Sequence, residues 1–217
     1  MNRSYLAALS LSMLAVAAAA PVYAQGMTVP KPTFGVLAGL DFATLGGSDV
    51  QDAGTRTGLT IGGFATFHID HRWGIEPELL FSQKGATEQS GSDKLTLKLN
   101  YIDIPVLARF DLPTTGQVHP FFLAGPTLSF QTTCDAEESS GSSSVSASCD
   151  DINQASPGSL SKKTFDLGAT FGAGVVFPAG KKLNLSVGLR YNLGLVDTFE
   201  NADVKNRTWA LVAGLTF

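Results

Sequence analysis

Large apolar residues alternate with small or polar ones along most of the chain after residue 33, and this alternation limits the possible folds more than any other feature. In 183–195, Leu, Val and Tyr occupy the odd positions, while Asn, Ser, Gly and Arg occupy the even ones. Successive side chains of a β-strand point to opposite faces, so such a run predicts a strand with one apolar face. Eight runs follow the pattern: 34–43, 58–69, 73–84, 95–110, 118–130, 165–177, 183–195 and 208–217.

Eight strands of this length fit an antiparallel barrel of a bacterial outer membrane, in which about 9–11 residues per strand cross the bilayer. A soluble lipocalin-like barrel also has eight strands, but its apolar face points inward. Here the charged residues and many of the 23 Gly fall on the parity opposite the large apolar residues. A narrow barrel has room inside for Gly and a few long charged side chains. The sequence therefore predicts an all-β, eight-stranded transmembrane barrel, with a periplasmic lipocalin-like carrier as the alternative if the facing is reversed.

The expected connections alternate in length, as in barrels with short periplasmic turns and longer extracellular loops. One run also changes phase, because 95–101 has its apolar residues on the parity opposite to that in 102–110. A bulge near Tyr101, or a strand that continues above the membrane, would explain this change. The short connections are 70–72, 112–117 and 178–181, and the long ones are 46–56, 85–94, 131–162 and 196–205.

The first 24 residues have the three parts of a secretory signal peptide: Arg3, an apolar run at 6–20, and small residues before a cleavage site after Ala24. The apolar run is shorter than the about 20 residues of a spanning helix, although a retained N-terminal anchor is the alternative. We expect a signal peptide at 1–24, a short periplasmic segment at 25–32 and the barrel at 33–217.

Several stretches resemble the PorT-like outer membrane β-barrel domain family of Bacteroidetes-type, Gram-negative bacteria. The resemblance implies an outer membrane location and an eight-stranded barrel, but no activity, and the secretion role of one member is not carried to this sequence. The C-terminal residues Trp209, Leu211, Leu215 and Phe217 also resemble the signal read by the barrel-insertion machinery. The matching stretches are GVLAGLDFA (35–43), EPELLFSQKG (76–85), YIDIP (101–105), LAGP (123–126), FGAG (171–174) and RYNLG (190–194).

Charged residues on the expected inner face could form a polar channel or a proton path. A barrel of this size leaves little aqueous bore, however, and buried charges must be paired and hydrogen-bonded. We therefore expect a luminal ion-pair network in which Glu78 pairs with Arg109 or Arg190. The residues of this expected network are Asp41, Glu76, Glu78, Lys84, Asp103, Arg109 and Arg190.

Residues 131–162 are rich in Ser and acidic residues and predict an irregular extracellular loop. The only two Cys of the chain, Cys134 and Cys149, lie in this one segment of an exported protein, which favours a disulfide over free thiols or a metal pair. Acidic residues of the segment could gather a divalent cation, but a solvated acidic loop is the simpler interpretation. These residues are Asp135, Glu137, Glu138, Asp150 and Asp151.

We expect no catalytic site, cofactor or metal site. An outer membrane enzyme acting on lipid needs a Ser activated by a His at the outer bilayer edge. The three His lie near the short-turn end instead, and neither Ser82 nor Ser186 has a His on the expected side. These His are His68, His71 and His119.

The charge content is low, at 16% with a net charge of −4, and argues against nucleic-acid binding. The sequence thus predicts a monomeric barrel of structural or interaction type, embedded in outer membrane lipid, that exposes its long loop to a surface ligand or protein. A small pore and an accessory of protein secretion are the alternatives.

Overall fold

The computed structural model describes residues 31–48, 53–91, 93–141, 143–155, 163–180, 182–199 and 203–217. The expected signal peptide and nearly all of the expected 25–32 segment lie outside these residues. In the described part no helix has the length and apolar character needed to cross a membrane.

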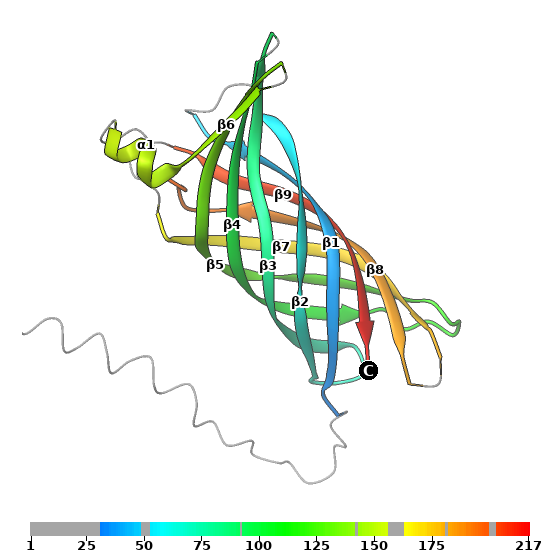
Figure 1. The fold of residues 1–217 in the computed structure, drawn as a ribbon. Coiled ribbons are helices and arrows are strands. Elements are labelled where there is room, and N and C mark those ends of the chain that lie inside the picture. Colours follow the sequence, from blue (N-terminus) through cyan, green and yellow to red (C-terminus); the bar gives the residue numbers. More distant parts are fainter. Residues whose placement is uncertain are drawn as a thin grey trace, which may run out of the picture.

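In the described ranges, nine strands and one short helix follow one another (Figure 1). The helix, α1 (Cys149–Ala155), lies between the sixth and seventh strands. The strands are β1 (Thr33–Gly46), β2 (Gly54–His68), β3 (Trp73–Ser90), β4 (Asp93–Asp111), β5 (His119–Ser140), β6 (Ser143–Ser148), β7 (Phe165–Pro178), β8 (Asn184–Gly194) and β9 (Lys205–Thr216).

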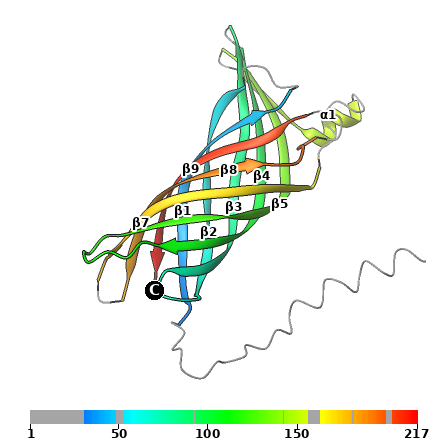
Figure 2. The ribbon, with the colours of Figure 1, turned by 180° about the vertical axis from the view of Figure 1, so that it is seen from behind.

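Eight of these strands close into an antiparallel barrel, as the sequence predicts. Each strand pairs with its neighbour in the order β4-β3-β2-β1-β9-β8-β7-β5, and the pairing of β4 with β5 completes the ring. The first and last strands meet along most of their length, from Gly35 opposite Thr216 to Gly46 opposite Lys205. Figures 1 and 2 show the closed ring from opposite sides. Among the strands that the structure describes, β6 pairs with β5 alone and lies outside the ring.

The large apolar side chains point outward and the charged ones point inward. Along β1, for example, Val36 and Leu40 are exposed while Leu37 and Asp41 are buried. The adjacent Phe121 and Phe122 of β5 divide in the same way, with exposures of 5% and 50%. This facing confirms the transmembrane interpretation and is opposite to that of a lipocalin-like carrier.

Inward-facing Gly residues make room for aromatic rings in the narrow interior. A Cβ added to Gly35 would lie 2.3 Å from Cζ of Phe64, and one added to Gly174 would lie 2.6 Å from Cζ of Phe121. Both distances are far below a van der Waals contact, so an Ala at either position would displace the ring. The abundance of Gly thus follows from the small radius of an eight-stranded barrel.

Two regions expected to be loops are strands instead. β3 and β4 pair without interruption to Ser90 opposite Asp93, which overturns the loop expected at 85–94. β5 continues to Ser140 and returns as β6, so much of 131–162 is a hairpin followed by α1 rather than an irregular loop. Gly91 and Gly141, with φ of +62° and +59°, supply the left-handed conformation at the two tight turns.

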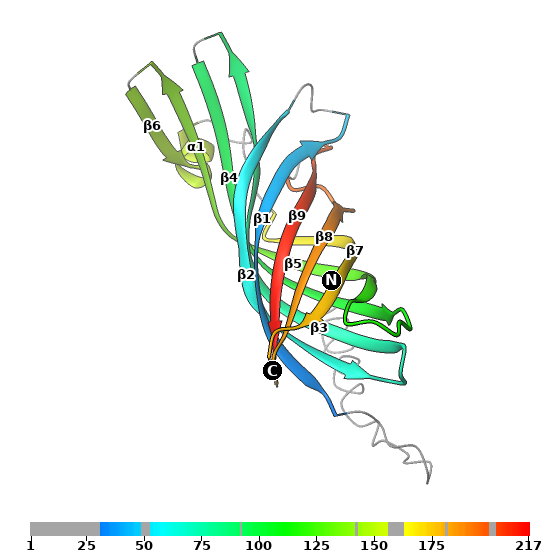
Figure 3. The same ribbon diagram turned by 90° about the vertical axis from the view of Figure 1, so that its right-hand side faces the viewer.

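We call the part of these hairpins that extends past the other strands the protruding sheet, residues 87–98 and 135–148. Figure 3 shows both hairpins rising beyond the rest of the barrel. Most side chains of this sheet are at least partly exposed on either face. The hydrophobic alternation that marks a membrane strand is therefore lost here, although the backbone pairing continues.

The change in apolar parity near Tyr101 results from both a bulge and a strand that continues beyond the barrel. β4 continues as one strand, and Leu99, Tyr101 and Asp103 all face inward. The extra residue belongs to β5, because Asn100 pairs with Thr133 whereas Tyr101 pairs with Gln131. The inner face of β4 thus keeps its parity but changes from charged to apolar toward the outer end.

A charge on the outer wall tests the facing directly. Ile61, 59% exposed, lies midway along β2, and Ile61→Arg should lower the free energy of unfolding in lipid vesicles by about 2–4 kcal/mol. The matched control is Leu95→Arg in the protruding sheet, where Leu95 is 46% exposed. This substitution should change the free energy of unfolding by no more than about 0.5 kcal/mol. Equal effects of the two substitutions would contradict the assignment of the outer wall to lipid.

Candidate functional site

A layer of crossed ion pairs fills the half of the interior that lies nearer the short turns. Glu76 and Glu78 stand two residues apart on β3, so both side chains point inward. Nη1 of Arg109 donates to Oε2 of Glu76 at 2.9 Å, and Nη1 of Arg190 donates to Oε2 of Glu78 at 2.6 Å. β3 and β8 are not neighbours in the sheet, so the second pair spans the interior. Of the two partners expected for Glu78, the structure shows Arg190.

Further contacts hold Arg109 in this layer. Its guanidinium also donates to both carboxylate oxygens of Asp111, and it stacks 4.1 Å from the ring centre of Phe121. Thr66 donates to the same Glu76 oxygen at 2.7 Å. A guanidinium with several fixed acceptors and an aromatic ring beneath it has little freedom to swing aside. The layer therefore acts as a plug.

A second charged layer lies nearer the outer end. Nζ of Lys84 forms an ion pair with Asp103 at 2.9 Å and lies 4.8 Å from the ring centre of Tyr101. Asp41 and Asp166 also face this layer. All seven expected network residues thus lie in the interior, but they divide into two layers rather than forming one network.

The expected network omitted two residues that the structure places in the outer layer. Asp166 lies on the inner parity of β7, which its position in the alternation could have indicated. Asn206 is fully buried at the start of β9, where Nδ2 donates to Asp166 at 2.9 Å and to the Tyr101 hydroxyl at 3.1 Å. A lone Asn before a β-run gives no such signal in the sequence.

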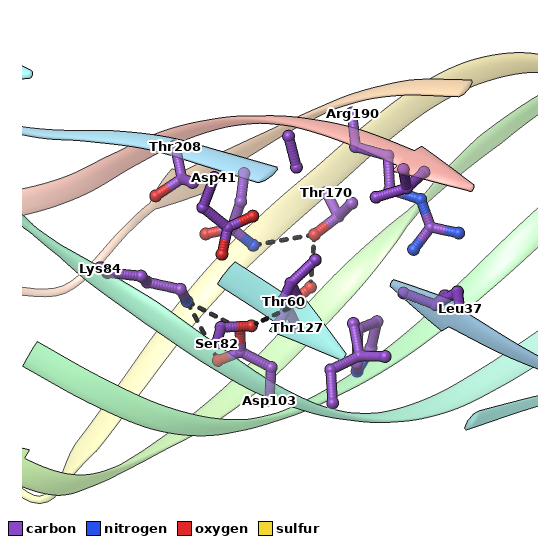
Figure 4. Close-up of a pocket in the computed structure, with 15 residues that line it drawn as sticks. Leu37, Asp41, Thr60, Ser82, Lys84, Asp103, Thr127, Thr170, Arg190 and Thr208 are labelled. Carbon is purple, nitrogen blue, oxygen red and sulfur yellow. Dashed lines mark hydrogen bonds and ion pairs between the residues drawn. The ribbon is translucent and has the colours of Figure 1, made fainter. Parts of the chain in front are cut away.

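Between the two layers the interior leaves a cavity of about 40 Å³ (Figure 4). Its lining includes Asp41, Ser82, Lys84, Asp103 and Thr208. This volume admits a few water molecules at most. The interior is therefore a packed polar core rather than an open tube.

An apolar cluster closes the interior toward the outer end. Leu99 and Tyr101 pack with Cys134 and Cys149, which form the disulfide that the sequence predicts. The Cα atoms of the two Cys are 5.4 Å apart, and the bond ties the start of α1 to β5. Ser148 caps this helix, because its hydroxyl accepts a hydrogen bond from the N–H of Asp151 at 3.1 Å.

The three His lie together at the short-turn end, as expected. They line one cavity of about 460 Å³ with Arg109 and Asp111, and His119 contacts the hydroxyl of Thr114 at 3.0 Å. Ser82 lines the interior cavity instead, and Ser186 bonds to the backbone of Gly214. Neither Ser therefore lies beside a His.

Within the part of the chain that the structure describes, no three His, Cys, Asp or Glu side chains are arranged to hold a metal ion. The acidic residues of 131–162 have other contacts in part. Glu137 pairs with Lys98 across the protruding sheet, and Asp151 accepts from the Ser148 hydroxyl. Glu137 and Asp151 are thus engaged with protein partners.

An exposed clasp joins two outer loops. The hydrogen bonds from Lys205 and Ser48 lower the pKa of Asp203 to about 2. Because the pKa in the folded chain lies below its ordinary value, the clasp contributes to stability at neutral pH. That contribution is lost as the pH falls through about 2.

Residues 25–200 match the family model described as an outer membrane protein beta-barrel domain. No curated protein matches the sequence. Neisserial surface protein A has a similar structure, with 19% identity and a TM-score of 0.51 over 86% of this chain and 98% of that one.

Two further solved structures resemble this fold less closely. OprG from Pseudomonas aeruginosa is 13% identical, with a TM-score of 0.48 over 85% of this chain and 95% of its own. Ail of Yersinia pestis is 16% identical, with a TM-score of 0.42 over 87% of this chain and 100% of its own. At these identities the likenesses concern the fold alone.

The pair between Glu78 and Arg190 can be tested by breaking it from either side. Glu78→Met or Arg190→Met alone leaves an uncompensated buried charge, and each should lower the free energy of unfolding by about 3–5 kcal/mol. The double variant should recover most of this loss, as measured by urea unfolding in lipid vesicles. Additive losses in the double variant would contradict the pairing.

The disulfide closes a loop with a sequence separation of 15 residues, for which the chain-entropy model gives about 3 kcal/mol. Replacing both Cys by Ala should lower the free energy of unfolding by about that amount. In the wild type, alkylation after unfolding should label no thiol without reductant and two thiols with it. A Cys134→Ala variant serves as the control with one free thiol, and two labelled wild-type thiols without reductant would rule out the disulfide.

Proposed function

This chain belongs to the outer membrane protein beta-barrel domain family, and we propose that it is an interaction barrel, which anchors in the outer membrane and presents its protruding sheet to a surface partner. The observation that carries the proposal is the open edge of β6. Within the described residues β6 pairs with β5 on one side and with no strand on the other. An open edge offers a row of backbone N–H and C=O groups to another extended chain.

The side chains of β6 support this role. Its sequence, SSVSAS, contains none of the Lys, Pro or inward charges that commonly protect an exposed edge from pairing. Val145 in its middle is 73% exposed, the largest exposure of any large hydrophobic residue described. An extended partner could thus gain both backbone hydrogen bonds and one apolar contact.

The excess of acidic residues near β6 indicates which kind of partner could bind. The protruding sheet holds five acidic and two basic residues, and the adjacent α1 begins with Asp150 and Asp151. A surface groove of about 350 Å³ is lined by Glu88, Asp93, Lys94, Leu95 and Glu138. This balance favours a partner whose extended segment carries Lys or Arg.

A pore is the weaker alternative, because the paired charges and the cavity of about 40 Å³ leave no wide aqueous path through the centre. Membership of the PorT-like subgroup, and with it a secretion role, rests on the sequence resemblance alone. Deletion of the gene followed by assay of the secreted proteins tests that role. Three further points stay predictions: cleavage after Ala24, the monomeric state, and the insertion signal at Trp209, Leu211, Leu215 and Phe217.

Photo-crosslinking on intact cells tests the interaction role. A photoreactive residue at Val145 should capture protein, whereas one at Leu211 on the outer wall should capture lipid. Placing Lys at both Ser144 and Ser146 should reduce the adducts at 145 severalfold by blocking edge pairing. Absence of protein adducts at 145, or adducts unaffected by the two Lys, would contradict the proposal.

A further inference from the structure

The outer charged layer holds more negative than positive charge. Asp41, Asp103 and Asp166 are all buried there, and among the described residues Lys84 is the cation that forms an ion pair with one of them. Arg190 also lines the cavity beside this layer, but it pairs with Glu78. In the plug layer, by contrast, each buried Glu has its own guanidinium. The outer layer therefore carries an excess of carboxylate that a bound cation or a proton can balance.

Asp41 is the main buried carboxylate of this layer whose negative charge has no paired cation in the described part of the chain. Lys84 commits its ammonium to Asp103, at 2.9 Å from one oxygen and 3.0 Å from the other. Among the described residues the carboxylate of Asp41, only 2% exposed, makes no hydrogen bond or ion pair, and Lys84 and Asp103 act on it through space with opposite sign. Asp166 accepts from Asn206 through Oδ2, while its Oδ1 has no hydrogen-bond partner.

The cavity of about 40 Å³ lies directly beside Asp41. Figure 4 shows Asp41 and Thr208 on one side of it, with Lys84, Ser82 and Asp103 on the other. Thr208 is 3% exposed, yet no described residue forms a hydrogen bond with its hydroxyl. A buried carboxylate and a buried orphan hydroxyl thus line the same small space.

The remaining polar lining is also rich in oxygen. It comes from hydroxyls of Thr and Ser and from the amide of Asn192, without His or Cys, and the one other charged group is the guanidinium of Arg190, which is committed to Glu78 at 2.6 Å. Oxygen donors select hard cations over transition metals. A single uncommitted carboxylate in so small a space matches one positive charge better than two, because divalent cations in proteins generally take several carboxylates or six or more oxygen ligands.

We propose that this cavity binds one monovalent cation of the Na⁺ or K⁺ class, with the Asp41 carboxylate and the Thr208 hydroxyl among its ligands. The ion supplies the charge that Lys84 cannot. Leaving a carboxylate unpaired in a barrel interior destabilises the folded state, and a bound cation offsets that destabilisation. Binding to the folded state alone makes the stability of the barrel depend on the concentration of the cation.

Thermal unfolding of the purified, refolded full barrel in lipid nanodiscs tests the proposal. At fixed pH and ionic strength, Na⁺ or K⁺ is exchanged for choline, which is too large for the cavity. The wild-type Tm should rise steadily with the logarithm of the Na⁺ or K⁺ concentration. Asp41→Asn should remove this dependence and, in choline, should unfold at a higher temperature than the wild type because no buried charge is left unpaired.

Two further variants keep the result interpretable. Thr208→Val removes one oxygen ligand and should raise the cation concentration needed for a given shift by about tenfold. Asp111→Asn is the matched control, since Asp111 pairs with Arg109 and lines the short-turn cavity, and it should keep the wild-type dependence. If Asp41→Asn does not refold, the cation dependence of the Tm of Thr208→Val, compared with that of Asp111→Asn, tests the proposal.

Thallium NMR gives a direct readout, with Tl⁺ as a substitute for K⁺. A resonance of bound Tl⁺ should appear with the wild type and with Asp111→Asn, but not with Asp41→Asn. If Asp41→Asn does not refold, Thr208→Val should weaken this resonance instead. Equal wild-type Tm values in choline and in Na⁺ or K⁺, together with no bound Tl⁺, would overturn the proposal and assign a proton to Asp41. A Thr208→Val variant identical to the wild type in both assays would also overturn it.

Discussion

The hydrogen bonds between β1 and β9 turn a sheet into a closed ring, and the other features of the molecule depend on that closure. Hydrocarbon offers no partner to a backbone N–H or C=O, so an open sheet edge within the bilayer would leave a row of unpaired groups. The register from Gly35 opposite Thr216 to Gly46 opposite Lys205 removes that edge. Eight strands then set a radius at which the interior holds side chains and little else.

That radius explains why the interior is both charged and filled. Gly at positions such as 35 and 174 admits the rings of Phe64 and Phe121, and the space left takes long side chains that must find partners. Glu76 and Glu78 meet two guanidinium groups, whereas the outer layer meets a single ammonium. Above the bilayer the constraint ends, water can satisfy an edge, and β6 can remain open.

Much of the barrel could be predicted because lipid on the outside requires apolar residues at every second position of a strand, as at Val36 and Leu40, while Leu37 and Asp41 face inward. The protruding sheet could not, since water on both faces erases the alternation while Gly91 and Gly141 still allow tight turns. The inward charges were predictable from parity. Their division into layers, and the choice of Arg190 for Glu78, depend on how the strands are staggered around the ring, which a single sequence does not show.

We propose that paired charges plug the barrel, so that the protein acts through its outer surface rather than by conducting. Planar-bilayer recording of a homogeneous, folded sample tests this most directly. We expect no steady conductance from the wild type, because the plug of Glu76, Glu78, Arg109 and Arg190 spans the interior. A steady single-channel conductance from the folded wild type would contradict it.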